Sequence, residues 1–266
     1  MKINTAKAKL YQASRHRLGD GTYSFVQLGK ELATNKLVAL KYINYSNYSE
    51  QDLENLHNEI TILKKIAKLN SNENFVKIID VINSGSEVCL VTELIEGGEL
   101  HDYCLEYANF MIPERICKWI FLKLLKAVGN LHDNKICHLD IKIENVMYNK
   151  TSHQVKLIDF GFSKEIKGEE KQRGFCGSCH YVPPEIIKKR KYDGRKADVW
   201  SLGVTLFLML TGDFPYPSMK PETTIHYPTF LSTDAISLLQ SMLTKNPNER
   251  ASISALVSHP WFSVQY

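Results

Sequence analysis

The spacing of apolar residues changes about a third of the way along the chain. Before that point, short runs rich in β-branched and apolar residues cover positions 17–28, 37–43, 76–81 and 88–94. Runs of this length and composition predict strands, and the first of them contains a glycine-rich turn. The beginning of the chain therefore predicts a small β-sheet.

One helix is predicted between the second and third of these strands. Ser49 and Asp52 can cap its first turn, because each side chain can bond the backbone of the other residue. Apolar residues then recur at spacings of three and four, as on one buried helix face: Leu53, Leu56, Ile60, Leu63 and Ile66.

After Gly97 and Gly98 the chain is predicted to be mainly helical. A long helix opens at Pro113, a residue favoured in the first turn, and carries one apolar face: Ile116, Ile120, Leu124, Val128 and Leu131. The glycine pair is a candidate hinge between a sheet-rich lobe and a larger helical lobe, and ligand pockets favour such junctions. We therefore expect an α+β fold with two lobes.

Composition and charge argue against several classes of function. The net charge of +4 arises from 33 basic and 29 acidic residues, so no field suited to nucleic acid is expected. The longest apolar stretch lies within residues 202–210 and is far shorter than the roughly 20 residues that span a membrane. Residues 1–12 lack the apolar run of a secretory signal. We expect an intracellular protein, cytoplasmic and/or nuclear, that binds neither nucleic acid nor membrane.

The six cysteines are scattered through a chain long enough to fold without disulfides, which favours reduced thiols. Cys176 and Cys179 form a C-x-x-C pair, but no second pair lies at zinc spacing, so a structural or incidental role is expected. None of the nine histidines pairs with another at a metal-ligand spacing. The cysteines and histidines therefore indicate no metal site.

Two segments in the first third indicate a nucleotide site. Residues 18–26 read LGDGTYSFV, with two glycines at G-x-G spacing and Ser24 where a third would complete the pattern. Glycines allow backbone amides to approach phosphate oxygens, although the same residues suit an ordinary hairpin turn. Residues 38–41 read VALK and end 15 residues after Val26. A V-A-x-K strand places its lysine beside nucleotide phosphates. Lys41 is therefore the candidate cation of this site.

A lysine in a partly buried cleft needs a carboxylate partner to stay charged and fixed in place. Glu59 follows Lys41 by 18 residues on the predicted helix, which suits a strand and a helix packed back against it. Glu54 is the alternative partner, although it precedes the helix centre. We predict an ion pair between Lys41 and Glu59.

The most specific segment is residues 138–145, HLDIKIEN, in which an aspartate, a lysine and an asparagine share one predicted loop. A second acid, Asp159, opens the sequence DFG after an apolar strand at residues 155–158. These groups suit phosphoryl transfer. Asp140 can orient an attacking hydroxyl and accept its proton, while Asn145 and Asp159 can hold Mg²⁺ across the phosphates.

With these motifs the chain resembles the eukaryotic protein kinase family over residues 11–262. Residues 183–185, PPE, stand where the family has A-P-E, residues 198–203 match its D-x-W-S-x-G helix, and Arg250 follows an Asn-Pro pair. The resemblance implies ATP and Mg²⁺ as cofactors, ATP lying in the cleft between the lobes. It also implies a buried ion pair between Glu185 and Arg250.

The same resemblance implies a bilobal kinase fold and its boundaries. The small antiparallel lobe with one helix would cover about 11–95, the hinge about 93–98 and the mainly helical lobe about 99–262. Residues 1–10 and 263–266 would be short flanks.

The resemblance also assigns the catalytic roles. Lys41 would contact the α and β phosphates, Asp140 would be the base, and Lys142 would steady the transferring phosphoryl group. Asn145 and Asp159 would bind the metal. The full catalytic set is Lys41, Glu59, Asp140, Lys142, Asn145 and Asp159.

Adenine recognition is assigned in the same way. Thr92 would be the gatekeeper, the backbone of residues 93–95 would read adenine, and Val26, Ala39 and Met147 would sandwich the ring, a role compatible with plain core packing. The full nucleotide-binding set is Leu18, Gly19, Asp20, Gly21, Thr22, Tyr23, Ser24, Phe25, Val26, Ala39, Lys41, Thr92, Glu93, Ile95 and Met147.

Two features favour serine or threonine as the acceptor. Lys142 is typical of that branch of the family, and residues 177–181, GSCHY, resemble its G-T-x-x-Y. Residues 258–262 and 175–178 are similar to the calmodulin-dependent and checkpoint kinase group. We expect no calmodulin-binding tail, because only four residues follow Phe262.

Two departures from the family occur together. Leu139 replaces the arginine of H-R-D, which in the family pairs with a phosphate on the activation loop. Residues 164–176 contain no serine, threonine or tyrosine that could carry this phosphate. We therefore predict activity without loop phosphorylation, the loop being ordered by other contacts or by an activating partner. A pseudokinase scaffold that binds ATP without transfer is the alternative function.

Glu99 and Glu144 match positions where related kinases bind arginines upstream of the acceptor. A preference for basic protein substrates is therefore predicted, the alternative being that both are solvated loop acids. The run KKRK at residues 188–191 is interpreted as a solvated helix end, with a nuclear localisation signal or a docking patch as alternatives. His138 is expected to be a core residue that supports the turn at Asp159. We expect a monomer.

Overall fold

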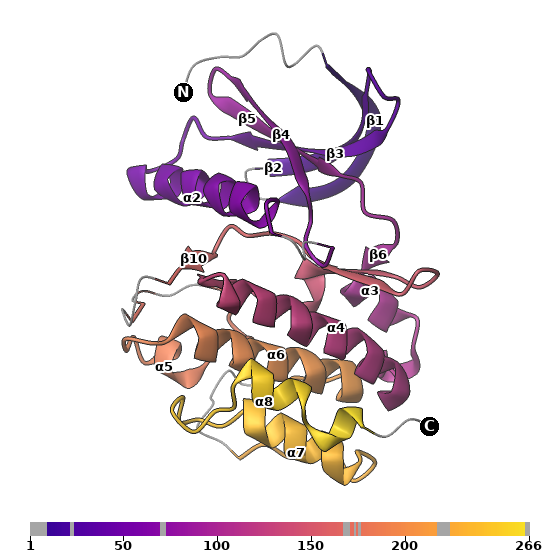
Figure 1. Cartoon of the computed structure of the whole chain (residues 1–266), viewed down its shortest axis with the longest axis vertical. Helices are drawn as coiled ribbons and strands as arrows, with labels where there is room; N and C mark the ends of the chain where they lie inside the picture. Colours follow the sequence, from indigo (N-terminus) through magenta and orange to yellow (C-terminus); the bar gives the residue numbers. More distant parts are fainter. Residues whose placement is uncertain are drawn as a thin grey trace. The chain divides into compact units, whose positions relative to one another are not determined.

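The computed structural model describes residues 10–21, 24–69, 73–166, 171–172, 174, 177–216 and 224–263. The chain divides into two compact units, Met1–Glu96 and Gly97–Tyr266 (Figure 1). Two residues of the nucleotide-binding set, Thr22 and Tyr23, lie outside the described residues, as does Cys176 of the C-x-x-C pair.

A five-stranded antiparallel sheet forms most of the first unit (Figure 1). Val38, Leu40, Ile82, Cys89 and Val91 form a buried cluster on one face of the sheet. The predicted sheet is confirmed, since its strands overlap all four predicted runs. In the order β1-β2-β3-β5-β4, the strands are β1 (Tyr11–Gly21), β2 (Ser24–Glu31), β3 (Leu37–Asn44), β5 (Glu87–Glu93) and β4 (Ile78–Ser84).

The predicted helix between strands is α2 (Glu50–Ile66). Its capping pair is confirmed, because Ser49 Oγ accepts the Asp52 N–H at 3.2 Å and the Ser49 N–H donates to Asp52 Oδ2 at 3.1 Å. Four of its five predicted apolar residues are buried: Leu56, Ile60, Leu63 and Ile66.

Leu53 is the exception, and 41% of it is exposed. The buried face of α2 also includes Glu59 and Ile62. With these two positions included, the centre of the buried face lies about 100° from Leu53 at the helical rotation per residue. The prediction for Leu53 was wrong because Ile62 and Glu59, which the apolar spacing left out, move the centre of the face away from it.

Helices dominate the second unit, with two small sheets beside them (Figure 1). The helices are α3 (Leu100–Leu105), α4 (Glu114–Asp133), α5 (Pro184–Ile187), α6 (Gly194–Thr211), α7 (Thr233–Met242) and α8 (Ile253–Val257), with 3₁₀ turns η1 (Ala108–Phe110), η2 (Ile143–Asn145) and η3 (Pro260–Phe262). Strands β6 (Gly98–Glu99), β8 (Val146–Asn149) and β9 (Gln154–Leu157) form one sheet, and β7 (Ile136–Cys137) pairs with β10 (Lys164–Glu165).

Two helices supply much of the core of this unit. α4 begins directly after Pro113, as predicted, and all but one of its predicted apolar residues are buried, Ile116 being half-buried. α6 is buried along nearly its whole length, including the polar residue Asp198. Within the described ranges, no helix combines the length and apolar character needed to cross a bilayer. The predicted α+β class is confirmed.

Candidate active site

One face of the first sheet carries several residues of the nucleotide-binding set. In the antiparallel register Lys41 of β3 lies opposite Val26 of β2, while Ala39 lies opposite Thr92 of β5. Cross-strand partners project to the same side of a sheet, and so do residues two apart on one strand. Val26, Ala39, Lys41 and Thr92 therefore share one face, opposite the face of Val38 and Leu40.

The predicted ion pair of Lys41 is present in this unit. Lys41 Nζ lies 2.9 Å from Glu59 Oε1, and the glutamate side chain is only 9% exposed. A buried carboxylate needs such a partner, because an unpaired buried charge is strongly destabilising. The alternative partner, Glu54, is exposed and accepts a hydrogen bond from Gln51 instead.

The glycine-rich turn joins β1 and β2. The register of the two strands shifts on either side of Arg17, and from Gly19, which pairs with Val26, to Gly21, which pairs with Ser24, it is continuous up to the turn. A Cβ added at Gly19 would meet no other atom within 4 Å, so packing inside the protein does not require glycine there. This open position fits a ligand that approaches the backbone closely, as a phosphate does.

Strand β5 ends at Glu93, where the expected adenine-reading segment begins. Two hydrogen bonds join Glu93 to Lys77, the residue directly before β4. The Glu93 N–H donates to the Lys77 carbonyl at 3.0 Å, and the Glu93 carboxylate accepts the Lys77 N–H at 3.0 Å. Ile95 follows as a half-buried residue. Met147 belongs to the second unit, on β8, so its predicted place beside the adenine ring stays a prediction.

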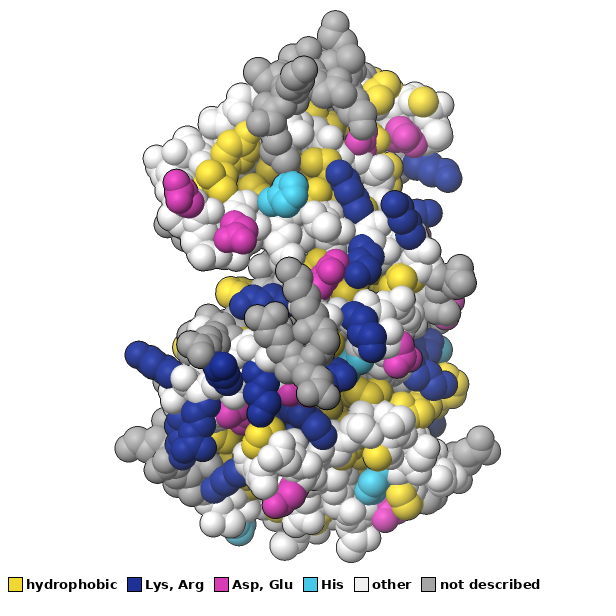
Figure 2. All heavy atoms as spheres, turned by 60° about the vertical axis from the view of Figure 1, so that its left-hand side comes forward, with side chains coloured by type: hydrophobic (Ala, Val, Ile, Leu, Met, Phe, Trp, Pro, Cys, Tyr) yellow, Lys and Arg dark blue, Asp and Glu magenta, His cyan; other side chains and the backbone are white. Residues whose placement is uncertain are grey.

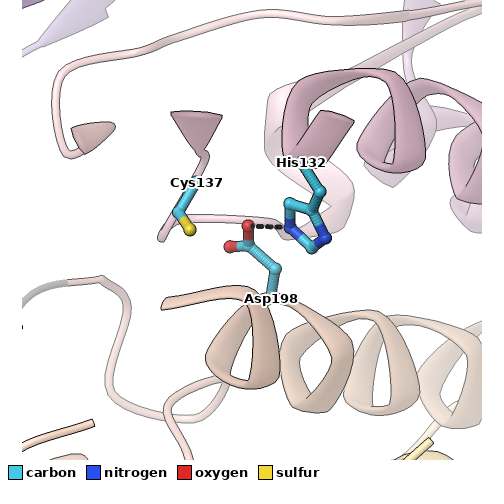
Figure 3. Close-up of side chains that lie close together, drawn as sticks. All are labelled: His132, Cys137 and Asp198. Atoms are coloured by element: carbon cyan, nitrogen blue, oxygen red, sulfur yellow. Dashed lines mark hydrogen bonds and ion pairs between the residues drawn. The ribbon is translucent and has the colours of Figure 1, made fainter. Parts of the chain in front are cut away.

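In the second unit a buried carboxylate fixes the loop of residues 138–145. Asp198 Oδ1 accepts the Leu139 N–H at 2.7 Å, and Asp198 Oδ2 accepts the His138 N–H at 2.9 Å. His132 Nε2 lies 2.8 Å from the same Oδ2 (Figure 3). Leu139 has a left-handed φ of 65°, a conformation unfavourable for leucine, and these bonds stabilise it.

His132, Cys137 and Asp198 lie close enough to share a metal ion (Figure 3). Their chemistry does not favour one. Both oxygens of Asp198 are already used by the loop amides, and the Cys137 thiol is buried beside Gly194. We assign the group a structural role. The sequence signal for it is Asp198, the one acid of α6, directly before a mainly apolar stretch, although the sequence alone did not assign Asp198 this role.

Asp140, the candidate base, is 4% exposed and is held by several donors. Its Oδ1 accepts both the N–H and the O–H of Ser178, each at 2.9 Å. Its Oδ2 accepts Asn145 Nδ2 at 2.9 Å and lies 3.3 Å from Lys142 Nζ. Lys142 Nζ also donates to Ser178 Oγ at 2.8 Å. Four side chains of the second unit thus meet at one point, and Ser178 is a functional candidate that had no individual role from sequence.

The candidate metal ligands are connected through the backbone. Asn145 Nδ2 also donates to the Asp140 carbonyl at 2.9 Å, so its amide hydrogens point to Asp140 and its oxygen remains to face a cation. The Ile158 N–H donates to the Asn145 carbonyl at 2.9 Å, directly before Asp159. Asp159 has a φ of 59°, and its Oδ1 accepts the Gly161 N–H at 3.1 Å. An amide oxygen and a carboxylate fit the oxygen ligation that Mg²⁺ prefers.

His138 is fully buried, and its ring lies 5.0 Å from the ring of Phe160. Ser163 Oγ donates to the His138 carbonyl at 3.1 Å, and the Asp140 N–H donates to Nδ1 at 3.3 Å. Burial lowers the pKa of His138, because desolvation opposes the charged imidazolium. The prediction of a core histidine that supports the turn at Asp159 is confirmed.

Leu139 occupies an apolar cluster. It is 4% exposed, and its buried neighbours are Cys137, Val182, Ile186, Tyr192 and Ala197. Ile166, at the start of the activation segment, packs against the same cluster. Further along that segment, Gln172 and Tyr192 exchange two backbone hydrogen bonds at 2.8 and 3.1 Å. Within residues 164–176, Ile166 is therefore held by apolar packing and Gln172 by backbone bonds.

The buried ion pair implied by the family resemblance is present. Arg250 Nη1 and Nη2 donate to the two oxygens of Glu185 at 2.8 and 3.1 Å. Arg250 is 1% exposed, and its Nη1 also donates to the Lys196 carbonyl at 2.6 Å. This bidentate pair ties the segment of residues 183–185 to the turn that precedes α8.

Two charged surfaces lie on the second unit. Partial burial raises the pKa of Glu99, and the nearby carboxylates of Asp102 and Glu144 raise it further. Tyr181 donates to Glu144 Oε2 at 3.4 Å. The basic run at residues 188–191 is exposed after the end of α5, and Figure 2 shows Lys and Arg side chains gathered on one face of this unit.

Comparisons with known proteins agree with this arrangement. The chain matches the family model for the protein kinase domain over residues 12–262. It is 35% identical over 260 residues to the probable serine/threonine-protein kinase MARK-C of Dictyostelium discoideum, which covers 94% of this chain and 33% of that protein. It is 30% identical over 272 residues to the serine/threonine-protein kinase kin-29 of Caenorhabditis elegans, which covers 99% of this chain and 32% of that protein.

The chain thus spans about a third of the length of these two relatives. The family model covers nearly the whole chain and includes the candidate catalytic residues of both units. The chain belongs to the protein kinase family.

Proposed function

We propose that this chain is an ATP-dependent protein kinase that transfers the γ-phosphate to serine or threonine hydroxyls of protein substrates. The observation that carries the proposal is the meeting of Asp140, Lys142, Asn145 and Ser178 in the second unit. A carboxylate, a cation and a hydroxyl within hydrogen-bond reach suit the positioning of an acceptor hydroxyl. The two relatives, both named as serine/threonine kinases, support this acceptor class.

In this proposal a substrate hydroxyl displaces one of the donors on Asp140 and gives its proton to that carboxylate. Lys142 stabilises the charge that develops on the transferring group, and Lys41, fixed by Glu59, positions the phosphates. Asn145 and Asp159 would hold Mg²⁺. Bound ATP would supply the γ-phosphoryl group, which would join the substrate oxygen as its bond to the departing ADP breaks, and the metal would neutralise part of the charge.

We further propose that the kinase needs no phosphate on its activation segment. In the apolar cluster, Leu139 takes the place of a phosphate-binding arginine, and Tyr192 of the same cluster bonds Gln172. These contacts order the activation segment in place of a charge-assisted hydrogen bond between an arginine and a phosphate. An activating partner is the alternative source of that order.

Substrates are proposed to be basic upstream of the acceptor. Glu99 and Glu144 lie near one another on the second unit, and the raised pKa of Glu99 reflects in part the neighbouring carboxylates. A pair of close carboxylates gains from binding arginine, which relieves their mutual repulsion. Peptides with and without upstream arginine, compared on wild type and Glu144→Gln, test this preference. An unchanged ratio would contradict it.

The proposed catalytic domain covers about 11–262, with lobes of about 11–95 and 99–262 and a hinge at about 93–98. The boundary between the two compact units, after Glu96, lies within this hinge. We propose that the domain acts as a monomer.

The decisive experiment measures transfer of radiolabelled γ-phosphate from ATP to basic serine and threonine peptides, with Mg²⁺ and with phosphatase-treated protein. We expect transfer by the wild type, its loss in Asp140→Asn, and its retention in Asp133→Asn, which removes an exposed acid from the end of α4. ATP binding without transfer by the wild type would favour the pseudokinase scaffold. Transfer only after treatment with another kinase would contradict the proposed independence from loop phosphorylation.

A further inference from the structure

The outer side of α4 exposes an aromatic ring that the proposed catalytic machinery does not use. Trp119 is 65% exposed, whereas Trp200 and Trp261 are buried. Its ring lies 6.3 Å from that of His153, in the turn between β8 and β9. Single exposed apolar residues are ordinary, so exposure alone does not identify a binding surface.

Basic residues flank this tryptophan at helical spacing. Arg115, Trp119, Lys123 and Lys126 are separated by four, four and three positions, so they follow one side of α4. They extend over about 17 Å at the rise of an α-helix. We call this surface, formed by these four residues and His153, the Trp119 face.

The cations of the Trp119 face lack acidic partners among the residues that the structure describes. The Lys123 ammonium donates to the His153 carbonyl, which fixes the turn against the helix. Glu114 begins the same helix, but its Oε1 accepts from Ser232 Oγ and Trp261 Nε1, both at 2.7 Å. The same Oε1 lies 3.9 Å from Lys118 Nζ, so this carboxylate pairs with groups other than Arg115.

We propose that the Trp119 face docks an acidic segment of a partner protein, with an apolar or proline side chain stacked on Trp119. Charge complementarity specifies the acidic residues, and the exposed ring specifies the apolar contact. An anionic membrane fits less well, because one exposed ring does not make the broad apolar face of a membrane-binding helix. A nucleic acid strand fits less well, because successive bases would need several stacking rings.

Docking at this face would hold a substrate or regulator near the enzyme without occupying Asp140. Such tethering raises the effective concentration of a second, weaker contact on the same partner. The inference concerns binding alone. It is measured without ATP, so its outcome is independent of the proposed kinase activity.

The test begins with a phage-displayed library of random peptides of about twelve residues, long enough to span the face in extended form. The library is selected on the wild type after depletion on Arg115→Gln/Lys123→Gln/Lys126→Gln. Selected peptides are synthesised and titrated while tryptophan emission is recorded, since Trp119 is the exposed tryptophan of the three. We expect enrichment of Asp and Glu, a change in emission, and affinity that weakens with added salt.

Trp119→Ala should weaken binding by at least about tenfold, as expected for a central aromatic anchor. Its binding is followed by fluorescence polarisation of a labelled peptide, because the emission signal is lost with the ring. Lys189→Gln/Arg190→Gln/Lys191→Gln is the matched control, since it removes the same charge from another exposed surface of this unit and should bind as the wild type.

Four outcomes would overturn the proposal. They are no enrichment over the depleted library, enrichment of neutral or basic peptides, equal loss of binding in the control variant, and tighter binding to phosphatidylserine vesicles or a single-stranded oligonucleotide than to any selected peptide.

Discussion

Replacing Leu139 with alanine should loosen the activation segment and destabilise the second unit. The side chain is 4% exposed within a cluster that includes Val182, Ile186 and Tyr192. Leu→Ala removes three carbons, which at about 0.8 kcal/mol each gives about 2.4 kcal/mol of lost transfer free energy. The residual cavity adds to this, so we expect the free energy of unfolding to fall by about 3 kcal/mol.

Tryptophan emission provides an assay that is specific to this unit. The chain has three tryptophans, Trp119, Trp200 and Trp261, and all three lie after Gly97. A change of about 3 kcal/mol should lower the melting temperature by about 6 to 12 °C for a unit of this size. Leu139→Met conserves most of the volume and should cost less than about 1.5 kcal/mol.

The functional consequence should follow the stability. Phosphoryl transfer by unphosphorylated Leu139→Ala should fall, because Ile166 and Val182, which lie before and after Ser178 in the chain, pack in this cluster. Leu139→Met should keep most of the activity. A melting temperature for Leu139→Ala within about 1 °C of the wild type would refute the buried role, as would identical losses in the two variants. Normal transfer by a destabilised Leu139→Ala would refute the link between the cluster and activity.

Three further predictions concern charged and titratable groups. Glu59→Gln keeps the side-chain shape but removes the charge that fixes Lys41, so the rate of phosphoryl transfer in steady-state kinetics should fall by about 100-fold. An unchanged rate would contradict the positioning role of Glu59. Arg250→Ala leaves Glu185 buried and unpaired and should destabilise the second unit by about 3 to 5 kcal/mol in urea unfolding, whereas a loss below about 1 kcal/mol would mean that the pair is dispensable. His138 has a pKa lowered by burial, so the unfolded chain binds its proton first as the pH falls. Its stabilising contribution should be complete above about pH 6.5 and decline below it. His138→Asn should flatten this slope in melts from pH 7 toward pH 5, while the exposed control His226→Asn should not, and parallel slopes in all three proteins would exclude the assignment.

Local sequence patterns predicted a large part of the fold and some of the site contacts. The strands, the cap of α2 and the pair between Lys41 and Glu59 follow from short-range spacing, because a strand and the next helix leave few geometric choices. Leu53 shows the limit of the same reasoning. Apolar spacing located a helix face, but the burial of Ile62 and Glu59 moved the centre of that face away from Leu53.

Other features of the site depend on contacts between distant positions. Ser178 reaches Asp140 across 38 residues, and Asp198 reaches Leu139 across 59. No periodicity in the chain encodes such distances, so a single sequence without the fold could not assign these roles. The apolar surroundings of Leu139 likewise could not be predicted from the sequence. The presence of leucine in place of arginine did indicate that the activation loop must be ordered by other contacts.

The Asp198 carboxylate holds the loop of residues 138–145 through hydrogen bonds from the main chain of the loop. The two hydrogen bonds that it accepts come from the backbone N–H groups of His138 and Leu139. They therefore do not depend on the side chain at position 139. Leucine in place of the family's arginine at position 139 need not change the backbone path that leads to Asp140. The side chain at position 139 and the hydrogen bonds that shape this loop are therefore separate features, so a change in one need not alter the other.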